Sequence, residues 1–194
     1  RLALAGAQHR ALQQIFGDLS SVRPMHRLLQ GDVGSGKTLV AALAAVRAIE
    51  HGHQVALMAP TELLAEQHAI NFANWFETMG IQVGWLAGKL KGKAKEAELA
   101  RIASGEAQMV VGTHALFQEH VEFHHLALVI IDEQHRFGVA QRLALRQKGN
   151  NPHQLMMSAT PIPRTLAMSY FADLDCSVID ELPPGRTPIR TRLI

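Results

Sequence analysis

The sequence predicts an α/β fold in which a mostly parallel β-sheet carries helices on both faces. Short apolar runs alternate with polar turns and amphipathic stretches, which is the rhythm of strand–helix–strand units. Two runs, Met109–Val111 and Leu126–Ile131, are apolar at every position, as strands buried on both faces are. Ligands of such sheets bind at the carboxyl ends of the strands. We therefore expect the functional residues to follow strands directly.

Other elements follow from apolar periodicity. The further predicted elements are a strand at 55–59, a helix at 61–78, a strand at 81–86, a helix at 94–104 closed by Gly105, and strands at 155–157 and 177–179. Within the helix at 61–78, Phe72, Trp75 and Phe76 fall at helical spacing, which favours a core position over base stacking.

Length and composition limit the classes of protein that fit. The chain has 194 residues, which suits one α/β domain and excludes a second domain of equal size. Its formal net charge of +2 permits nucleic-acid binding without arguing for it. A single cysteine, Cys176, excludes an internal disulfide and fits a reducing cytoplasm. No apolar run approaches the ~20 residues of a membrane helix, so we expect no membrane partner. The start at Arg1 leads us to expect a piece of a longer chain.

A glycine-rich loop lies between a predicted strand, 28–30, and a predicted helix, 39–50. Its sequence, Gly31–Thr38, is the P-loop pattern in the setting that the motif requires. Glycines let successive N–H groups point at a phosphate, and the helix N-terminus adds its positive end. Lys37 would reach the β- and γ-phosphates, and Thr38 would coordinate Mg²⁺. The alternative, a glycine-rich turn without a ligand, leaves this setting unexplained. The expected phosphate-binding set is Gly31, Gly34, Ser35, Gly36, Lys37 and Thr38.

Two adjacent carboxylates, Asp132 and Glu133, follow the fully apolar run 128–131. They are costly to place there without a partner, and a metal–nucleotide complex on the neighbouring strand end would be one. Asp132 would hold Mg²⁺, and Glu133 would orient and deprotonate the attacking water. A helix N-cap is the alternative, but it accounts for Asp132 alone.

The run Asp132-Glu133-Gln134-His135 resembles the DExH box of superfamily 2 helicases. Further resemblances to motifs of that superfamily lie at Ala59–Leu64, Val111–His114, Met157–Pro161 and Gln8. The resemblance implies a RecA-like P-loop NTPase with ATP and Mg²⁺ as cofactors. It also implies that Gln8 reads adenine, Thr61 and Thr113 contact DNA, Ser158 and Thr160 couple nucleotide state to DNA, and His135 senses the γ-phosphate.

Within that superfamily the chain is most similar to the RecG family of bacterial branched-DNA helicases. The similarity rests on the P-loop spelling, on His135–Val139, on Pro161–Leu166 and on Asp180–Pro188. Transcription-repair coupling translocases share the first three features, whereas Trp85–Lys89 and the last run favour RecG. At Ala5 the family often has Thr, which is a departure.

The resemblance implies that residues 1–180 are the first of two RecA-like motor domains and that 181–194 is a linker. The second motor domain and a fork-binding wedge domain would belong to the same full-length chain, and branched or duplex DNA would be the substrate.

Other signals leave alternatives open. His124 and His125 suggest a metal, but no cysteine or carboxylate falls at ligand spacing nearby. Lysines recur at every second position from 89 to 95, as in a solvated turn or in a contact with DNA phosphates. A P-loop switch or metabolic ATPase is a second function hypothesis. The Asp132–His135 box, together with the separate Ser-Ala-Thr motif at Ser158–Thr160, argues against it. An inactive scaffold is a third, although every catalytic position holds a competent residue.

Overall fold

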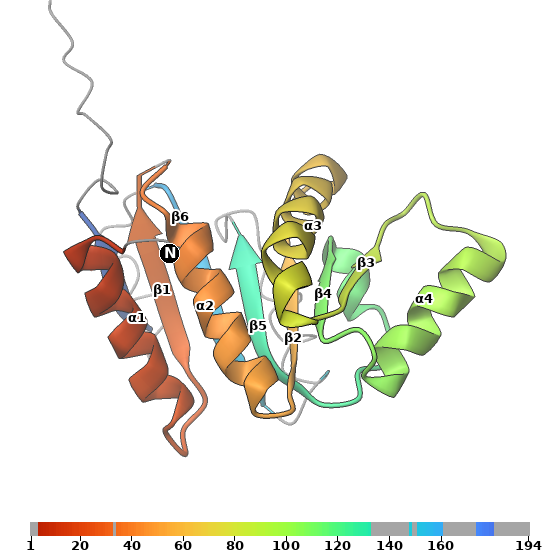
Figure 1. Cartoon of the computed structure of the whole chain (residues 1–194), viewed down its shortest axis with the longest axis horizontal. Helices are drawn as coiled ribbons and strands as arrows, with labels where there is room; N and C mark the ends of the chain where they lie inside the picture. Colours follow the sequence, from red (N-terminus) through yellow and green to blue (C-terminus); the bar gives the residue numbers. More distant parts are fainter. Residues whose placement is uncertain (1–3, 33, 133–147, 149–150, 161–173, 181–194) are drawn as a thin grey trace, which may run out of the picture.

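Seven strands form one sheet, and every pairing in it is parallel. The structure is a computed structural model that describes residues 4–32, 34–132, 148, 151–160 and 174–180. The strand order is β3-β4-β2-β5-β6-β1-β7 (Figure 1). The strands are β1 (His26–Gly31), β2 (Gln54–Met58), β3 (Val83–Leu86), β4 (Met109–Gly112), β5 (Leu126–Asp132), β6 (His153–Ser158) and β7 (Asp175–Ile179).

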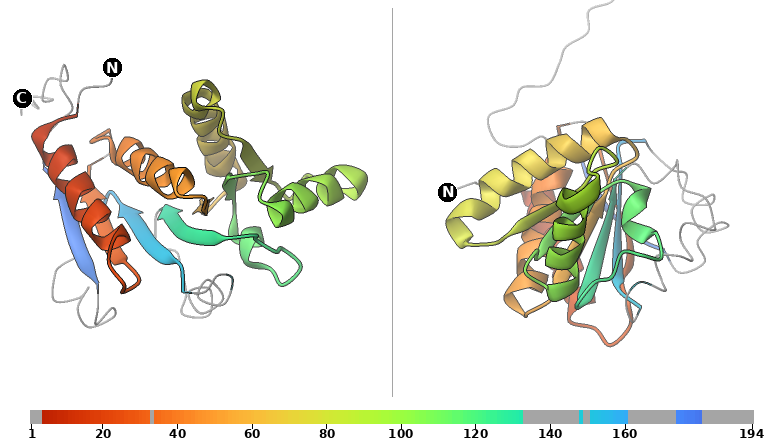
Figure 2. Two further views of the ribbon diagram at one scale, coloured as in Figure 1. Left: turned by 60° about the horizontal axis from the view of Figure 1, so that its bottom comes forward. Right: turned by 90° about the vertical axis from the view of Figure 1, so that its right-hand side faces the viewer.

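Helices cover both faces of this sheet, as the sequence predicts. The helices α1, α2 and α3 pack on one face, and α4 packs on the other together with the short turn η2 (Figures 1 and 2). In the described ranges, no helix combines the length and the apolar character that crossing a membrane requires. The helical elements are α1 (Gly6–Leu19), α2 (Lys37–Glu50), α3 (Glu62–Phe76), α4 (Gly92–Ser104) and the 3₁₀ turns η1 (Glu77–Met79) and η2 (His114–Phe117).

Two apolar layers hold the fold together. Alternate residues of each central strand point to opposite faces, so Leu57 joins the layer under α1, α2 and α3 while Met58 joins the layer under α4. Every residue of β2 and β4 is buried, as expected for parallel strands covered on both faces. Phe72 and Phe76 are fully buried in the first layer, and Trp75 packs partly buried against it, which confirms their assignment to the core.

The helix α1 was not among the predicted elements. Its buried positions Ala7, Gln8, Ala11, Leu12 and Ile15 follow a helical period, but two of the five are alanines and one is a glutamine, so the segment shows few large apolar residues. Predicted and observed bounds agree within a few residues elsewhere. Gly105 has a left-handed φ of 83° and closes α4 as expected.

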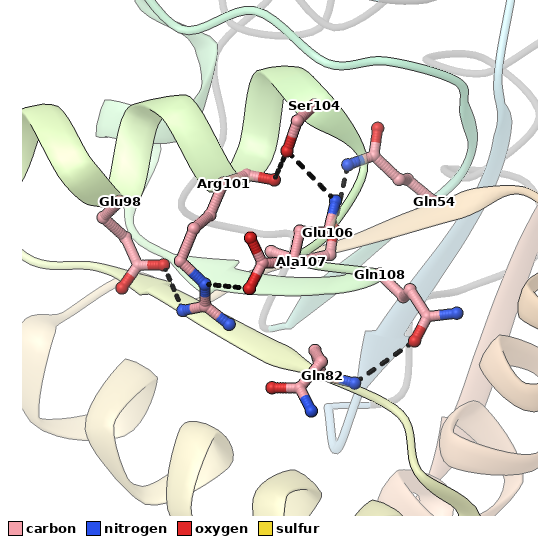
Figure 3. Close-up of polar contacts among 8 residues, drawn as sticks. All are labelled: Gln54, Gln82, Glu98, Arg101, Ser104, Glu106, Ala107 and Gln108. Carbon is pink, nitrogen blue, oxygen red and sulfur yellow. Dashed lines mark hydrogen bonds and ion pairs between the residues drawn. The ribbon is translucent and has the colours of Figure 1, made fainter.

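A buried glutamine fixes the amino end of β2 to its surroundings. Gln54 is 3% exposed. Its Nε2 donates to the carbonyls of Ile102 and Ala107, both at 2.9 Å. Its Oε1 accepts from the backbone N–H groups of His124 at 2.7 Å and His125 at 3.0 Å. Figure 3 shows Gln54 beside the polar cluster at the end of α4. One side chain thus supplies partners for four backbone groups that burial would otherwise leave unpaired.

Histidines at the amino ends of the strands make the fold sensitive to acid. Burial lowers the pKa of His53 below 6.5, and the neighbouring His125 lowers it further. Burial also lowers the pKa of His153, whose Nδ1 accepts a hydrogen bond from the N–H of Met25 at 2.8 Å. Protonation of His153 would remove that acceptor. The unfolded chain therefore binds these protons more readily than the folded chain does.

We expect the contribution of these two histidines to the free energy of unfolding to be constant above about pH 7 and to fall as the pH drops below 6.5 toward the lowered folded-state pKa values. Urea unfolding at about pH 7.5 and about pH 5.5 measures the difference. His153→Asn keeps a hydrogen-bond acceptor and does not titrate, so its free energy of unfolding should fall less between these two pH values than that of the wild type. Exposed His120→Asn is the matched control. If the free energy of unfolding falls equally in wild type and in His153→Asn, His153 is not a source of the acid sensitivity.

Candidate nucleotide-binding site

The predicted phosphate loop and the predicted metal ligand lie at the same edge of the sheet. Gly31 ends β1, Asp132 ends β5 and Ser158 ends β6, and these three strands are parallel. The register pairs Leu29 of β1 with Met157 of β6, and Met157 in turn with Asp132. Two strand spacings, about 10 Å, therefore separate the backbones of β1 and β5.

One expectation about this edge is wrong. We expected Asp132 on the strand next to the phosphate loop, but β6 lies between β5 and β1. The intervening strand brings Ser158 level with Gln30 at the end of β1. The serine of the Ser-Ala-Thr motif thus lies between the loop and the carboxylate. Strand order depends on long crossover connections, which the local sequence pattern does not encode.

The phosphate loop has the backbone conformation that its glycines allow. Gly34 has φ of 79° and Gly36 has φ of 87°, both in the left-handed region that other residues rarely adopt. Gly36 is the N-cap of α2, and Ser35 N–H bonds the Asp32 carbonyl at 3.0 Å. The loop therefore connects β1 directly to the N-terminus of α2. The backbone N–H groups and the dipole at a helix start favour an anion there.

Gly31 leaves no space for a side chain. A Cβ on Gly31 would lie 2.5 Å from Ser35 Oγ and 3.2 Å from both the Cβ and the carbonyl oxygen of Ile179. Ser35 is 2% exposed, and its buried hydroxyl has no hydrogen-bond partner in the part of the chain that the structure describes. A buried hydroxyl without a partner is costly unless a ligand supplies one. A phosphate oxygen in this loop would fit that requirement.

The ammonium group of Lys37 lies against the loop itself. Lys37 Nζ donates to the carbonyl of Gly31 at 2.5 Å and to that of Asp32 at 3.1 Å. These contacts place the cation at the mouth of the loop, on the first turn of α2. The arrangement supports the predicted role of Lys37 in holding phosphate.

Asp132 makes a contact that the sequence analysis missed. Its Oδ2 lies 2.7 Å from Nε2 of His68 on α3. His68 is 9% exposed and falls on the buried stripe of α3 with Ala65, Ala69 and Phe72. The sequence feature that could have indicated this contact is a histidine at a core position of an otherwise apolar helix face. Only the pairing of β2 with β5 brings α3 to the acidic strand end.

Ser158 and Thr160 form a tight turn at the end of β6. Ser158 Oγ accepts from the N–H of Thr160 at 3.1 Å and lies 3.2 Å from the Thr160 carbonyl. Ser158 is 1% exposed, whereas Thr160 is exposed. A hydroxyl turn between the phosphate loop and Asp132 is suitably placed to respond to a nucleotide.

Gln8 supports the phosphate loop from α1. Its Nε2 donates to the Ser35 carbonyl at 3.0 Å, and its Oε1 accepts from the N–H of Ala5 at 2.9 Å. The side chain is 1% exposed. Ala5 is the N-cap and has no hydroxyl, so the second half of a capping box is missing. The described contacts of Gln8 are internal, and its adenine-reading role stays a prediction.

The two predicted DNA contacts differ in exposure. Thr61 is exposed and caps α3 by accepting from Leu64 N–H at 3.3 Å. Thr113 is 8% exposed and lies 3.5 Å from the N–H of Ala115. Thr61 is therefore better placed than Thr113 to reach an external ligand. Glu62, the first residue of α3, accepts from Gly88 N–H at 2.7 Å and fixes the loop that carries the exposed Lys89.

Several predicted residues lie outside the described part of the chain. Glu133 and His135 follow Asp132 directly and fall in the range 133–147. The expected linker 181–194 is also outside. Within the described ranges, no group of three or more His, Cys, Asp or Glu residues is arranged to hold a metal ion.

Comparison with known proteins identifies the family. A model of the DEAD/DEAH box helicase family matches residues 6–169. The chain belongs to this helicase family. The helicase domain is 71% identical over 190 residues to the ATP-dependent DNA helicase RecG of Escherichia coli K12, covering 96% of this chain and 27% of that protein. It is 70% identical over 189 residues to RecG of Pasteurella multocida, covering 95% of this chain and 27% of that protein.

A solved structure gives the same result. The helicase domain matches a structure of RecG bound to a three-way DNA junction with a TM-score of 0.85 and 46% identity. The match covers 97% of this chain and 25% of that chain. These matches confirm the expected RecA-like helicase fold. The chain spans about a quarter of the length of the relatives that it matches.

The crowding around Gly31 predicts the effect of one methyl group in the helicase domain. Gly31→Ala would displace Ser35 Oγ, so we expect nucleotide affinity to fall about tenfold, equivalent to ~1.4 kcal/mol. Binding of a fluorescent ADP analogue to the full-length protein measures it. The control is Gly17→Ala on α1, where nothing lies within 4 Å of the added Cβ. That change should stabilise α1 by roughly 0.5–1 kcal/mol without altering affinity. Unchanged affinity in Gly31→Ala would contradict the prediction.

Proposed function

We propose that this chain is the first motor domain of an ATP-dependent DNA helicase or translocase that acts on branched DNA. The observation that carries the proposal is the convergence of the phosphate loop, Ser158 and Asp132 at one edge of the sheet. In this proposal residues 1–180 form the motor domain, and residues 181–194 lead to a second motor domain. The similarity to a RecG structure that is bound to a three-way DNA junction supports the choice of branched DNA.

ATP with Mg²⁺ is the proposed cofactor, and the residues at the sheet edge fit it. Backbone N–H groups from Gly31 to Gly36 and the ammonium of Lys37 would hold the phosphates. Thr38 and Asp132 would hold Mg²⁺. The bound metal would neutralise charge on the phosphate oxygens. The buried hydroxyl of Ser35 and the missing space at Gly31 support a ligand in this loop.

The residues after Asp132 complete the proposed site. Glu133 would orient and deprotonate the water that attacks the γ-phosphate. His135 would sense the γ-phosphate and relay its presence to Ser158 and Thr160. The hydroxyl turn that these two residues form at the end of β6 supports the relay, because it borders both the loop strand β1 and the acidic strand β5.

The rest of the full-length protein would supply what this domain lacks. A second RecA-like domain would close over ATP and provide an arginine, and such arginines raise hydrolysis rates by about 10³–10⁵. As the two domains open and close, each would bind and release DNA in turn, which would move the protein along the DNA. A wedge domain would bind the fork. The isolated domain should therefore bind nucleotide weakly, hydrolyse it slowly and unwind nothing.

The proposed DNA surface lies at the start of α3. Thr61 and the helix N-terminus offer a hydroxyl and backbone amides, which contact phosphate without reading sequence. The loop of Lys89 is fixed beside them through Glu62. Thr113 follows the adjacent strand β4 and would support this surface from within. A mildly charged surface of this kind suits a motor that slides along DNA of any sequence.

The ATPase rate of the full-length protein tests the motor function. We expect the rate to rise with DNA, and to rise more with forked and four-way substrates than with linear duplex. Glu133→Gln should retain nucleotide binding and lose about 10²–10⁴ in rate, because it removes the proposed general base. The motor function fails if DNA leaves the wild-type rate unchanged. Undiminished hydrolysis in Glu133→Gln would remove Glu133 from its role.

A further inference from the structure

A single charge-assisted hydrogen bond joins the proposed metal ligand to α3. His68 Nε2 and Asp132 Oδ2 lie 2.7 Å apart, although the residues are separated by 64 positions in sequence. The side chain of His68 is 11% exposed and that of Asp132 is 19% exposed. The distance falls in the short range typical of bonds to a carboxylate. The contact is therefore a close one, largely screened from solvent by the fold.

The chemistry of the two groups fixes the direction of this bond. An ionised carboxylate only accepts, so Nε2 of His68 is the donor. The other ring nitrogen, Nδ1, is buried and has no hydrogen-bond partner among the described residues. The ring of Phe72 lies beside it, with centroids 6.4 Å apart. Among the described residues, the polar interaction of His68 is thus directed at Asp132 alone.

A purely structural role explains this histidine poorly. The neighbouring positions on the buried face of α3, including Ala65, Ala69 and Phe72, are all apolar. An apolar side chain at position 68 would suit that face and avoid a buried nitrogen without a partner. A histidine there offers one thing that an apolar residue lacks, which is a donor for the carboxylate at the end of β5.

We propose that His68 is a positioning residue that orients Asp132 for Mg²⁺. The Nε2 donor holds Oδ2 and restrains rotation of the carboxylate, so that Oδ1 would remain available as the metal-binding oxygen. The inference rests on the proposed function, in which Asp132 serves the metal. Partners that hold a metal-binding side chain from behind change metal affinity by about 10–100-fold when removed.

Measurements of nucleotide binding with and without Mg²⁺ distinguish a role of His68 in positioning Asp132 from a role in folding. Titrations of the full-length protein use a fluorescent ADP analogue, first in Mg²⁺ and then in EDTA. His68→Ala should weaken binding about tenfold in Mg²⁺ and leave binding in EDTA unchanged. The Mg²⁺ concentration for half-maximal ATPase activity should rise by more than kcat falls. His68→Leu lacks the donor but suits the apolar face, so it repeats the test if His68→Ala is poorly folded.

Rescue by a conservative variant completes the design. His68→Gln places an N–H donor near the position of Nε2, so it should recover most of the Mg²⁺-dependent affinity. The matched control is His51→Ala, since His51 is exposed at the far end of α2 and its ring Nδ1 lies 2.8 Å from the Arg47 carbonyl of the same helix. His51→Ala should behave as wild type in both titrations.

Two results would overturn the role of His68. One is wild-type Mg²⁺ dependence in both donor-free variants. The other is an equal loss of affinity in Mg²⁺ and in EDTA, which would show a structural role. Asp132→Ala distinguishes these results from failure of the proposed function. If Asp132→Ala keeps wild-type Mg²⁺ dependence, then Asp132 is not a metal ligand and the proposed site itself is wrong.

Discussion

Parallel pairing of the strands is the constraint on which the site depends. Because all the described pairings run in one direction, the carboxyl end of every strand lies at the same edge of the sheet. The phosphate loop, the hydroxyl turn and the acidic strand end therefore meet, although Gly31 and Ser158 are 127 positions apart along the chain. The helices α2 and α3 also begin at this edge, so their positive ends add to the same region.

The buried strands determine which polar groups can reach this edge. The residues of β5 before Asp132 are almost all buried, so a carboxylate is tolerated only where the strand leaves the core. Even there it needs a partner, and His68 provides one from the helix that follows β2. The same reasoning applies to Gln54 at the opposite edge, where a buried amide satisfies backbone groups of three segments. Polar side chains at the two ends of the strands thus perform different tasks.

The sequence predicted the parts of the site whose signals are local. The phosphate loop, its flanking strand and helix, and the acidic strand end all depend on runs of about ten residues, and the structure confirms their placement at one edge. The order of the strands depends on crossovers between distant segments, which is why Asp132 was placed one strand too near. The contacts of Gln8 with Ser35 and of His68 with Asp132 were missed for the same reason. Small residues concealed α1, since Ala7 and Ala11 bury well but contribute little apolar signal.

An anion that binds to Lys37 must replace the hydrogen bonds that the ammonium group makes to its own loop. The ammonium is already solvated by the carbonyls of Gly31 and Asp32, so a ligand must exchange those internal bonds for its own oxygens. A weakly charged anion gains little from that exchange, whereas a polyphosphate offers several oxygens and more than one negative charge at once. If the loop holds phosphate as proposed, this exchange would favour highly charged phosphates over singly charged anions.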